Sequence, residues 1–198
     1  MATKGKSWSK RSRQWFAWGL ALDRVSTSSW TGERGARFPK LGAGEAAQLD
    51  GHALFFTGRS PRFAGRVAAL AEAKGDQVHG LLHQLDDAQW ALVEAFERAE
   101  GGRPKKVKVR CGSRAVEAVA FVPPRGEGAE IDEGYLAALV RGLIASQLPK
   151  DYLQARAAEA LLVERVQRVG RERGLLVFAG GQLVWAVILL YQNGLLWN

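Results

Sequence analysis

The chain has 198 residues and a formal net charge of +8, from 28 basic and 20 acidic side chains. This length predicts one domain with room for a short extension. Apolar residues make up 47% of the sequence, which is enough for a buried core and excludes wholesale disorder. The single cysteine, Cys111, excludes an internal disulfide, disfavours a cysteine-based zinc site and favours a reducing compartment.

The positive charge is concentrated at the N-terminus. Residues 1–14 contain five basic side chains and no acid, and no apolar run of the signal-peptide type follows them. We expect residues 1–13 to form a disordered basic arm. Such an arm can contact nucleic acid or anionic lipid. Because no nucleic-acid-binding module is recognisable, nucleic acid is not expected as a partner.

The first half of the chain predicts strands separated by turns. The apolar run at 14–20 predicts a strand that leads into a turn. Residues 26–50 are rich in Ser, Gly and Ala and are expected to be a loop with at most one helix. Further strands are predicted at 51–57 and 78–85, with turns at 58–62 and 73–76. Residues 66–71 fit a strand or a helix.

The clearest helix follows the strand at 78–85. Asp86 or Asp87 can cap it, because a carboxylate accepts hydrogen bonds from the free amides of the first turn. Trp90, Val93 and Glu97 then fall on roughly one face. Glycines and a proline at 101–104 end the helix.

Two strands and two helices complete the predicted order. The strands lie at 106–110 and 114–122, and the helices at 131–146 and 151–168. Since the chain has no regular alternation of strand and helix, we expect an α+β fold with a small, mostly antiparallel sheet or barrel and packed helices.

Two histidines have the spacing of a metal pair on a helix, but the surrounding sequence predicts a strand. On a strand, His79 and His83 would share one face about 13 Å apart, which is too far to bind one ion. No metal site is therefore expected.

The C-terminal segment at 174–191 has Gln182 as its only strongly polar side chain and follows several arginines. A helix needs about 20 apolar residues to span a bilayer. One interpretation is a membrane anchor with its basic flank in the cytoplasm. The other, slightly favoured because apolar residues continue through Trp197, is a packed or oligomer-forming element. The oligomeric state does not follow from the sequence.

Four segments, in order, resemble the gamma-glutamylcyclotransferase family over roughly residues 14–160. Trp-Phe-Ala-Trp-Gly-Leu-Ala-Leu at 15–22 is similar to the family's Tyr-Phe-Ala-Tyr-Gly-Ser-Asn-Leu. Residues 54–68 resemble its aromatic strand and following Gly-Val-Ala strand. Residues 78–85, with Leu-Val-Glu-Ala-Phe-Glu at 92–97, resemble Val-x-Gly-Val-Leu-Tyr-x-Leu and Leu-Asp-x-Phe-Glu-Gly. The closing match is Leu-Pro-Lys-Asp-Tyr at 148–152, like Gly-Leu-Pro-x-x-Tyr.

The resemblance implies a cytoplasmic enzyme without cofactor, of acyltransferase or lyase type, that releases 5-oxoproline from a gamma-glutamyl amine or peptide, as in glutathione metabolism. Its domain would span 14–162, followed by a basic and then apolar extension at 163–198. Glu97 would be the general acid/base. The implied substrate-binding residues are Trp18, Gly19, Leu20, Ala21, Leu22 and Tyr135, with the amides of Leu20, Ala21 and Leu22 as anion donors.

Other interpretations remain open at each position. Periodicity alone favours Glu97 as a solvated helix residue, and only the resemblance places it in a pocket. Glu94 lies one turn earlier on a similar face. Leu20 and Ala21 replace the family's Ser and Asn. These changes leave open, as the alternative to the enzyme, an inactive relative that acts as a binding or scaffold protein. Its C-terminal segment at 174–191 is where this relative would associate with a membrane. Arg59 and Arg62 fit either contacts to an acidic substrate or exposed loop positions.

Overall fold

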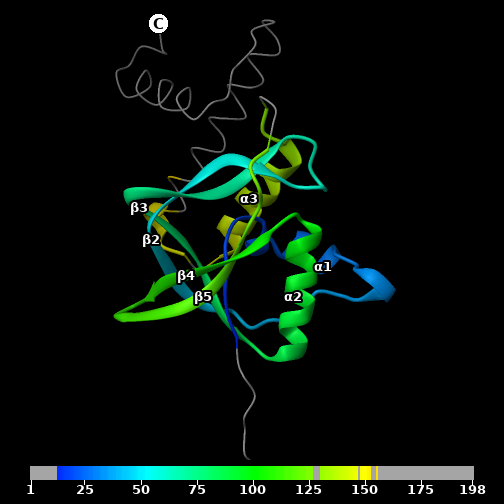
Figure 1. Cartoon of the computed structure of the whole chain (residues 1–198), viewed down its shortest axis with the longest axis horizontal. Helices are drawn as coiled ribbons and strands as arrows, with labels where there is room; N and C mark the ends of the chain where they lie inside the picture. Colours follow the sequence, from blue (N-terminus) through cyan, green and yellow to red (C-terminus); the bar gives the residue numbers. More distant parts are fainter. Residues whose placement is uncertain (1–12, 127–129, 147, 153–154, 156–198) are drawn as a thin grey trace, which may run out of the picture.

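The computed structural model describes residues 13–126, 130–146, 148–152 and 155. Five strands form a closed barrel in the order β1-β3-β2-β4-β5 (Figure 1). Neighbouring strands are antiparallel except for β1 and β5, which pair in parallel where Trp15 meets Val119. The predicted α+β class with a mostly antiparallel barrel is confirmed. The strands are β1 (Arg13–Ala17), β2 (Glu45–Arg59), β3 (Arg66–Leu85), β4 (Arg103–Cys111) and β5 (Arg114–Val122).

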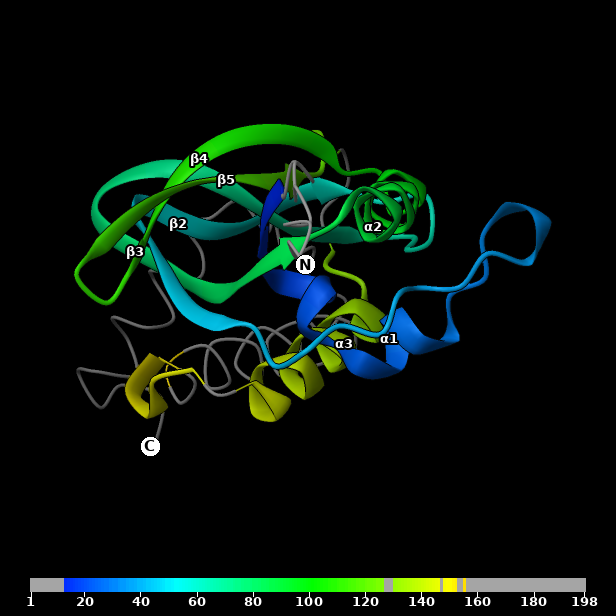
Figure 2. The same ribbon diagram turned by 90° about the horizontal axis from the view of Figure 1, so that it is seen from below.

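Short helical elements cover the barrel. Figure 2 shows α1 and α3 side by side below the strands and α2 at one end of the barrel. A 3-10 helix, η1, connects β1 to α1. Because η1 packs against α3, the end of β1 lies close to α3. The helices are η1 (Gly19–Leu22), α1 (Arg24–Ser29), η2 (Glu33–Gly35), α2 (Asp87–Ala99) and α3 (Glu133–Ala145).

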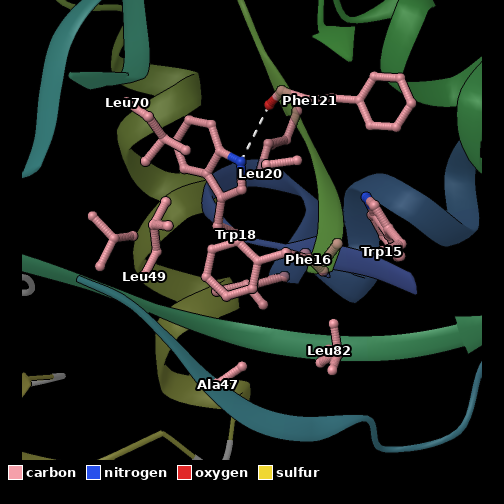
Figure 3. Packing of buried hydrophobic residues seen from close by; sticks show 14 of the residues in the cluster. Trp15, Phe16, Trp18, Leu20, Ala47, Leu49, Leu70, Leu82 and Phe121 are labelled. Carbon is pink, nitrogen blue, oxygen red and sulfur yellow. Dashed lines mark hydrogen bonds between the residues drawn. The ribbon is translucent and has the colours of Figure 1, made fainter. Parts of the chain in front are cut away.

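One apolar core joins the barrel to α2 and α3. It contains Trp15 and Phe16 from β1, Val93 from α2 and Leu139 from α3, each at most 2% exposed. Trp18 lies in the same core, where its indole N–H donates to the backbone carbonyl of Phe121 at 3.2 Å (Figure 3). This bond satisfies the one polar group of a buried tryptophan side chain.

The helix α2 follows the predicted pattern. The Asp86 carboxylate accepts from the Gln89 amide at 2.8 Å, and the Gln89 side chain accepts from the Asp86 amide at 3.1 Å, which is a capping box. Trp90, Val93 and Phe96 are buried along the face that meets the barrel. The α2 helix therefore packs against the core through this buried face.

Several local predictions are wrong, among them the turn at 58–62, whose first two residues belong to β2. Residues 45–50 belong to β2 rather than to a loop, because Ala47 and Leu49 alternate into the core. Residues 73–76 lie within β3 instead of forming a turn. They sit where the β2/β3 register shifts between Asp50 and His52, so the strand accommodates extra residues as an irregularity without reversing.

Arg13 belongs to β1, so it is not part of a disordered arm. The rest of the predicted arm, most of the helix predicted at 151–168 and the segment at 174–191 lie outside the described residues, as does the extension at 163–198. Within the part of the chain that the structure describes, no helix is long and apolar enough to cross a membrane.

Candidate active site

A small cavity lies between η1, α2, α3 and the ends of β2, β3 and β5. Its volume is about 40 Å³, room for roughly three water molecules. Five of the seven predicted site residues line it: Trp18, Leu20, Ala21, Glu97 and Tyr135. The sequence positions that the resemblance singled out are thus brought together from three separate elements.

The other two predicted residues, Gly19 and Leu22, belong to η1 but do not line the cavity. Gly19 has φ = +57°, and a Cβ there would lie 3.3 Å from Tyr135 Oη. A glycine meets both demands, because it adopts positive φ without strain and has no side chain. Leu22 is buried in the core and anchors the end of η1.

Glu97 is half-buried as a residue, and its carboxyl group is surrounded by protein. Burial raises the pKa of this carboxyl to about 8, because the charged form loses its hydration. The Trp15 side chain opposes the shift, and the negative charge of Glu100 adds to it. The predicted apolar environment of this carboxyl group is therefore present.

Trp15 is a site residue that the sequence analysis missed. Its indole nitrogen is buried and forms no hydrogen bond of ordinary geometry within the described residues, yet it reaches toward Glu97 closely enough to lower the pKa of that carboxyl. A buried donor that lacks a partner favours any negative charge placed beside it. Trp15 is therefore positioned to stabilise the ionised form of Glu97.

Glu94, the competing acid, is in a different environment. Its carboxylate accepts from Arg98 Nη2 at 2.7 Å and from the Trp90 indole N–H at 2.8 Å. The hydrogen bond from Arg98 lowers the pKa of Glu94. Glu94 does not line the cavity. The structure thus separates two acids that sequence periodicity could not distinguish.

Glu100 also lines the cavity and was not predicted. Its Oε1 accepts from Arg62 Nη1 at 3.1 Å, and its Oε2 accepts from the Ser60 hydroxyl at 3.4 Å. Ser60 Oγ in turn accepts from the Arg62 amide at 3.1 Å. The useful signal was helical spacing, because Glu100 follows Glu97 by three residues and so points to a similar side.

Tyr135 is 4% exposed. Burial raises the pKa of its hydroxyl far above the ordinary value; the Ala68 backbone opposes this, and the charges of Glu97 and Glu100 reinforce it. The hydroxyl therefore keeps its proton at neutral pH and can act as a hydrogen-bond donor.

The predicted set of amide donors in η1 needs a correction. The Ala21 amide donates to the Trp18 carbonyl at 3.2 Å, so it is occupied by the helix itself. The amides of Gly19 and Leu20 precede this first bond, and the structure shows no backbone hydrogen bond donated by them within the described residues. At the cavity, the Leu20 amide is therefore available as a donor, and the Ala21 amide is not.

An ion pair with a buried carboxylate fixes the end of η1. Asp23, which follows η1 and caps α1, is 2% exposed and accepts from Arg141 of α3 at 2.8 Å. It also accepts from the Ser26 hydroxyl at 2.7 Å. The loop that carries Trp18 to Leu22 is therefore tied to α3 by a polar contact as well as by packing.

No group of three metal-binding side chains occurs within the described ranges. His79 and His83 both lie on β3, as predicted. His83 packs against Trp15 at 5.4 Å between ring centroids, whereas His79 packs against Tyr152 at 4.6 Å. The two imidazoles thus contact different aromatic neighbours.

The barrel and the carboxylate-bearing α2 give this chain the gamma-glutamyl cyclotransferase fold. A solved structure named gamma-glutamyl cyclotransferase matches with a TM-score of 0.61 and 18% identity, over 74% of this chain and 87% of that chain. An uncharacterized protein from Homo sapiens matches with a TM-score of 0.60 and 20% identity over the same shares. YkqA from Bacillus subtilis matches with a TM-score of 0.57 and 19% identity, over 78% of this chain and 56% of YkqA.

No family profile matches this sequence, and no curated protein does. The structural matches establish a common fold at low sequence identity. The resemblance seen in the four sequence segments is confirmed at that level, and the chemistry has to be argued from the residues of the cavity.

Proposed function

We propose that this protein is a gamma-glutamylcyclotransferase-like enzyme that releases 5-oxoproline from a gamma-glutamyl amine or peptide, with Glu97 as general acid/base. The observation that carries the proposal is the sheltered Glu97 carboxyl, whose pKa is raised to about 8 by burial, facing a cavity with Tyr135 and the start of η1. The fold shared with a named gamma-glutamyl cyclotransferase supports it.

The reaction asks little of the protein. The substrate's α-amine attacks its own γ-carbonyl carbon, a C–N bond closes the five-membered ring, and the bond to the leaving nitrogen breaks. Because nucleophile and carbonyl belong to one molecule, their effective concentration is already high. The protein has to take one proton from the α-ammonium and supply one to the leaving amine.

Glu97 suits both proton transfers. An α-ammonium has a pKa of about 8, close to the raised pKa of about 8 at Glu97. Matched values make the transfer nearly thermoneutral, and the protonated Glu97 then carries the proton that the leaving amine needs. Such assistance is typically worth about 10²- to 10⁴-fold in rate.

The remaining residues would hold the negative charges of the substrate. The Leu20 amide is a donor suited to the oxyanion formed during ring closure. Tyr135 supplies a neutral hydroxyl donor across the cavity. Neither contribution depends on the serine and asparagine side chains that Leu20 and Ala21 replace.

The proposal also includes the absence of a cofactor and the cellular location of the protein. No cofactor is needed for this chemistry, and a cytoplasmic location fits the single, buried Cys111. Attachment to a membrane through residues 174–191, and a catalytic domain that spans 14–162, remain predictions from the sequence.

The size of the cavity favours a second candidate, a binding or scaffold protein that keeps the fold without the activity. Small-molecule sites usually occupy about 300–1,000 Å³, whereas this cavity has about 40 Å³ and both Trp18 and Leu20 form its wall. A gamma-glutamyl group would need side chains at the cavity to move apart.

Turnover separates the two candidates. Purified protein is incubated with gamma-glutamyl amines, dipeptides and glutathione, and 5-oxoproline is measured by mass spectrometry. The enzyme proposal predicts 5-oxoproline together with an equal amount of the released amine from at least one substrate. Absence of 5-oxoproline across the whole panel rejects it in favour of the binding protein.

A further inference from the structure

An ion pair between Arg62 and Glu100 lies beside the cavity, and its two partners differ in how far they are exposed to solvent. The Glu100 side chain is 10% exposed and faces the cavity, whereas the Arg62 side chain is 41% exposed and meets it from outside. The Arg62 guanidinium also lies 5.3 Å from the centre of the Phe63 ring, and Phe63 lines the cavity. These contacts place a cation at the rim and an anion within it.

Two acidic side chains line the cavity. Glu97 and Glu100 contribute carboxyl groups, and no lysine or arginine lines it within the described residues. The amino-acid end of a gamma-glutamyl compound is a zwitterion, with an ammonium and a carboxylate on the same carbon. The Glu100 carboxylate attracts the ammonium and repels the substrate carboxylate, so a cation is needed to admit the whole group.

We propose that Arg62 and Glu100 recognise the zwitterionic end of the substrate: Arg62 binds the α-carboxylate, while Glu100 binds the α-ammonium and presents it to Glu97. The proposal rests on the proposed function, and it assigns substrate selection to two residues to which the resemblance gives no role. When the substrate binds, the Arg62–Glu100 ion pair separates. Arg62 then pairs with the α-carboxylate of the substrate, and Glu100 pairs with its α-ammonium.

The exchange is favourable on physical grounds. A partly exposed ion pair contributes little to stability because solvent screens it, so separating it costs little. The guanidinium can bind a carboxylate through two parallel hydrogen bonds, which is stronger and more specific than its single hydrogen bond to Glu100. Ser60 retains Glu100 through its hydroxyl when Arg62 leaves.

The pair predicts which substrates are accepted. Compounds with both a free α-amine and a free α-carboxylate satisfy Glu100 and Arg62 together. A 4-aminobutanoyl amide has the same nucleophilic amine and the same carbonyl, but no carboxylate. It can close a five-membered lactam by the same chemistry, so it reports on Arg62 without altering the reacting atoms.

The test compares Arg62→Gln with Arg59→Gln, using a gamma-glutamyl substrate and its 4-aminobutanoyl analogue. Arg59 is exposed at the end of β2, and the structure shows no ion pair to its side chain within the described residues. Arg62→Gln is expected to lower kcat/KM for the gamma-glutamyl substrate by about 10- to 100-fold and to leave the analogue within about threefold. Arg59→Gln should change neither. Equal losses on both substrates, or no loss, would overturn the proposal.

Exchanging the two charges of the Arg62–Glu100 pair distinguishes a role in substrate recognition from a role in protein stability. In the double variant Arg62→Glu with Glu100→Arg, the ion pair is retained but its polarity is reversed. The melting temperature should stay near that of the wild type, while selectivity for the gamma-glutamyl substrate should be lost. Recovery of wild-type selectivity would mean that the pair acts only as a structural link.

Binding distinguishes this inference from the proposed function. The affinity of Glu97→Gln for a gamma-glutamyl dipeptide is measured by calorimetry, with and without Arg62→Gln. If the wild type forms no 5-oxoproline but the affinity falls at least about tenfold with Arg62→Gln, the enzyme proposal fails and the recognition site stands. If 5-oxoproline forms and affinity is independent of Arg62, the enzyme stands and the recognition site fails.

Discussion

Gly19 of η1 lies directly against the hydroxyl of Tyr135 on α3: a Cβ at Gly19 would be 3.3 Å from Tyr135 Oη. The Gly19 backbone has φ = +57°, a conformation in which side chains are strained. The first predicted motif and the closing helix thus meet at a position where only glycine fits without adjustment. The position of η1 beside α3 depends on this contact.

Gly19→Ala should therefore impair the site as well as the backbone. We expect a loss of about 1–2 kcal/mol in the free energy of unfolding and a larger relative loss of kcat/KM, because η1 must shift away from Tyr135. Gly35→Ala is the control, since Gly35 also has positive φ, at +76°, but a Cβ there would have no other atom within 4 Å. Equal effects of both variants on activity would contradict the role of the contact.

The raised pKa of Glu97 makes stability depend on pH. The folded protein keeps the Glu97 proton up to about pH 8, whereas the unfolded chain loses it near the ordinary value of 4.5. Unfolding therefore releases a proton between these values, and the free energy of unfolding falls as pH rises, then levels off above about 8. Glu97→Gln removes this proton release.

Denaturant titrations between pH 5 and 9 measure the effect. At pH 8, Glu97→Gln should be more stable than the wild type by roughly 1–3 kcal/mol, a range reduced because Glu97 is half-buried. The difference should shrink toward pH 5. A constant difference at every pH would show that Glu97 ionises at its ordinary pKa.

Trp15 should set the ionisation of Glu97. Because its indole N–H favours the charged carboxylate, Trp15→Phe should raise the pKa of Glu97 and move the rising midpoint of the kcat/KM against pH profile upward by about 0.5–1 unit. Trp90→Phe is the matched control, since that indole N–H bonds to Glu94. A midpoint that moves equally in both variants would argue for a general packing effect.

The Asp23–Arg141 pair should stabilise the loop. Burial raises the pKa of Asp23, but hydrogen bonds from Arg141 and Ser26 outweigh it and leave the pKa lowered. Arg141→Met should lower the free energy of unfolding by about 1–3 kcal/mol at neutral pH, because the buried Asp23 carboxylate loses its ion-pair partner. The loss is limited because the amide and hydroxyl of Ser26 still donate to Asp23. This contribution is present above the ordinary Asp23 pKa of 3.8 and is lost as pH falls below it.

Arg98→Met provides the comparison for Arg141→Met. Arg98 pairs with Glu94 on the exposed face of α2, where such pairs contribute about 0.3–0.5 kcal/mol. Thermal or chemical unfolding at pH 7 should therefore rank Arg141→Met well below Arg98→Met. Similar small losses would place the Asp23 pair among ordinary surface contacts.

Local signals in the sequence predicted much of the fold. The α2 cap at Asp86 and its buried Trp90 and Val93 followed from short-range patterns, and the bounds of β5 agree with the prediction. Residues 45–50 were missed because alanine and polar residues are weak strand formers, although Ala47 and Leu49 alternate inward. Closure of the barrel between β1 and β5 joins distant strands, which no local pattern specifies.

The candidate site also contains residues that the sequence predicted and residues that it did not. Glu97, Trp18 and Tyr135 were found because they lie in segments that resemble a known family. The Arg62–Glu100 pair and the approach of Trp15 to Glu97 depend on how α2 packs beside the barrel, so neither follows from periodicity. Choosing Glu97 over Glu94 required the environment of each carboxylate, because both positions are acceptable on a half-exposed helix.

The central claim is that one enclosed carboxyl group performs the proton transfers, and a single comparison tests it. Release of 5-oxoproline is measured for the wild type, Glu97→Gln and Glu94→Gln, with folding confirmed by circular dichroism. We predict that Glu97→Gln lowers kcat by about 10²- to 10⁴-fold while Glu94→Gln stays close to the wild type. A folded Glu97→Gln protein that keeps wild-type turnover would contradict the account.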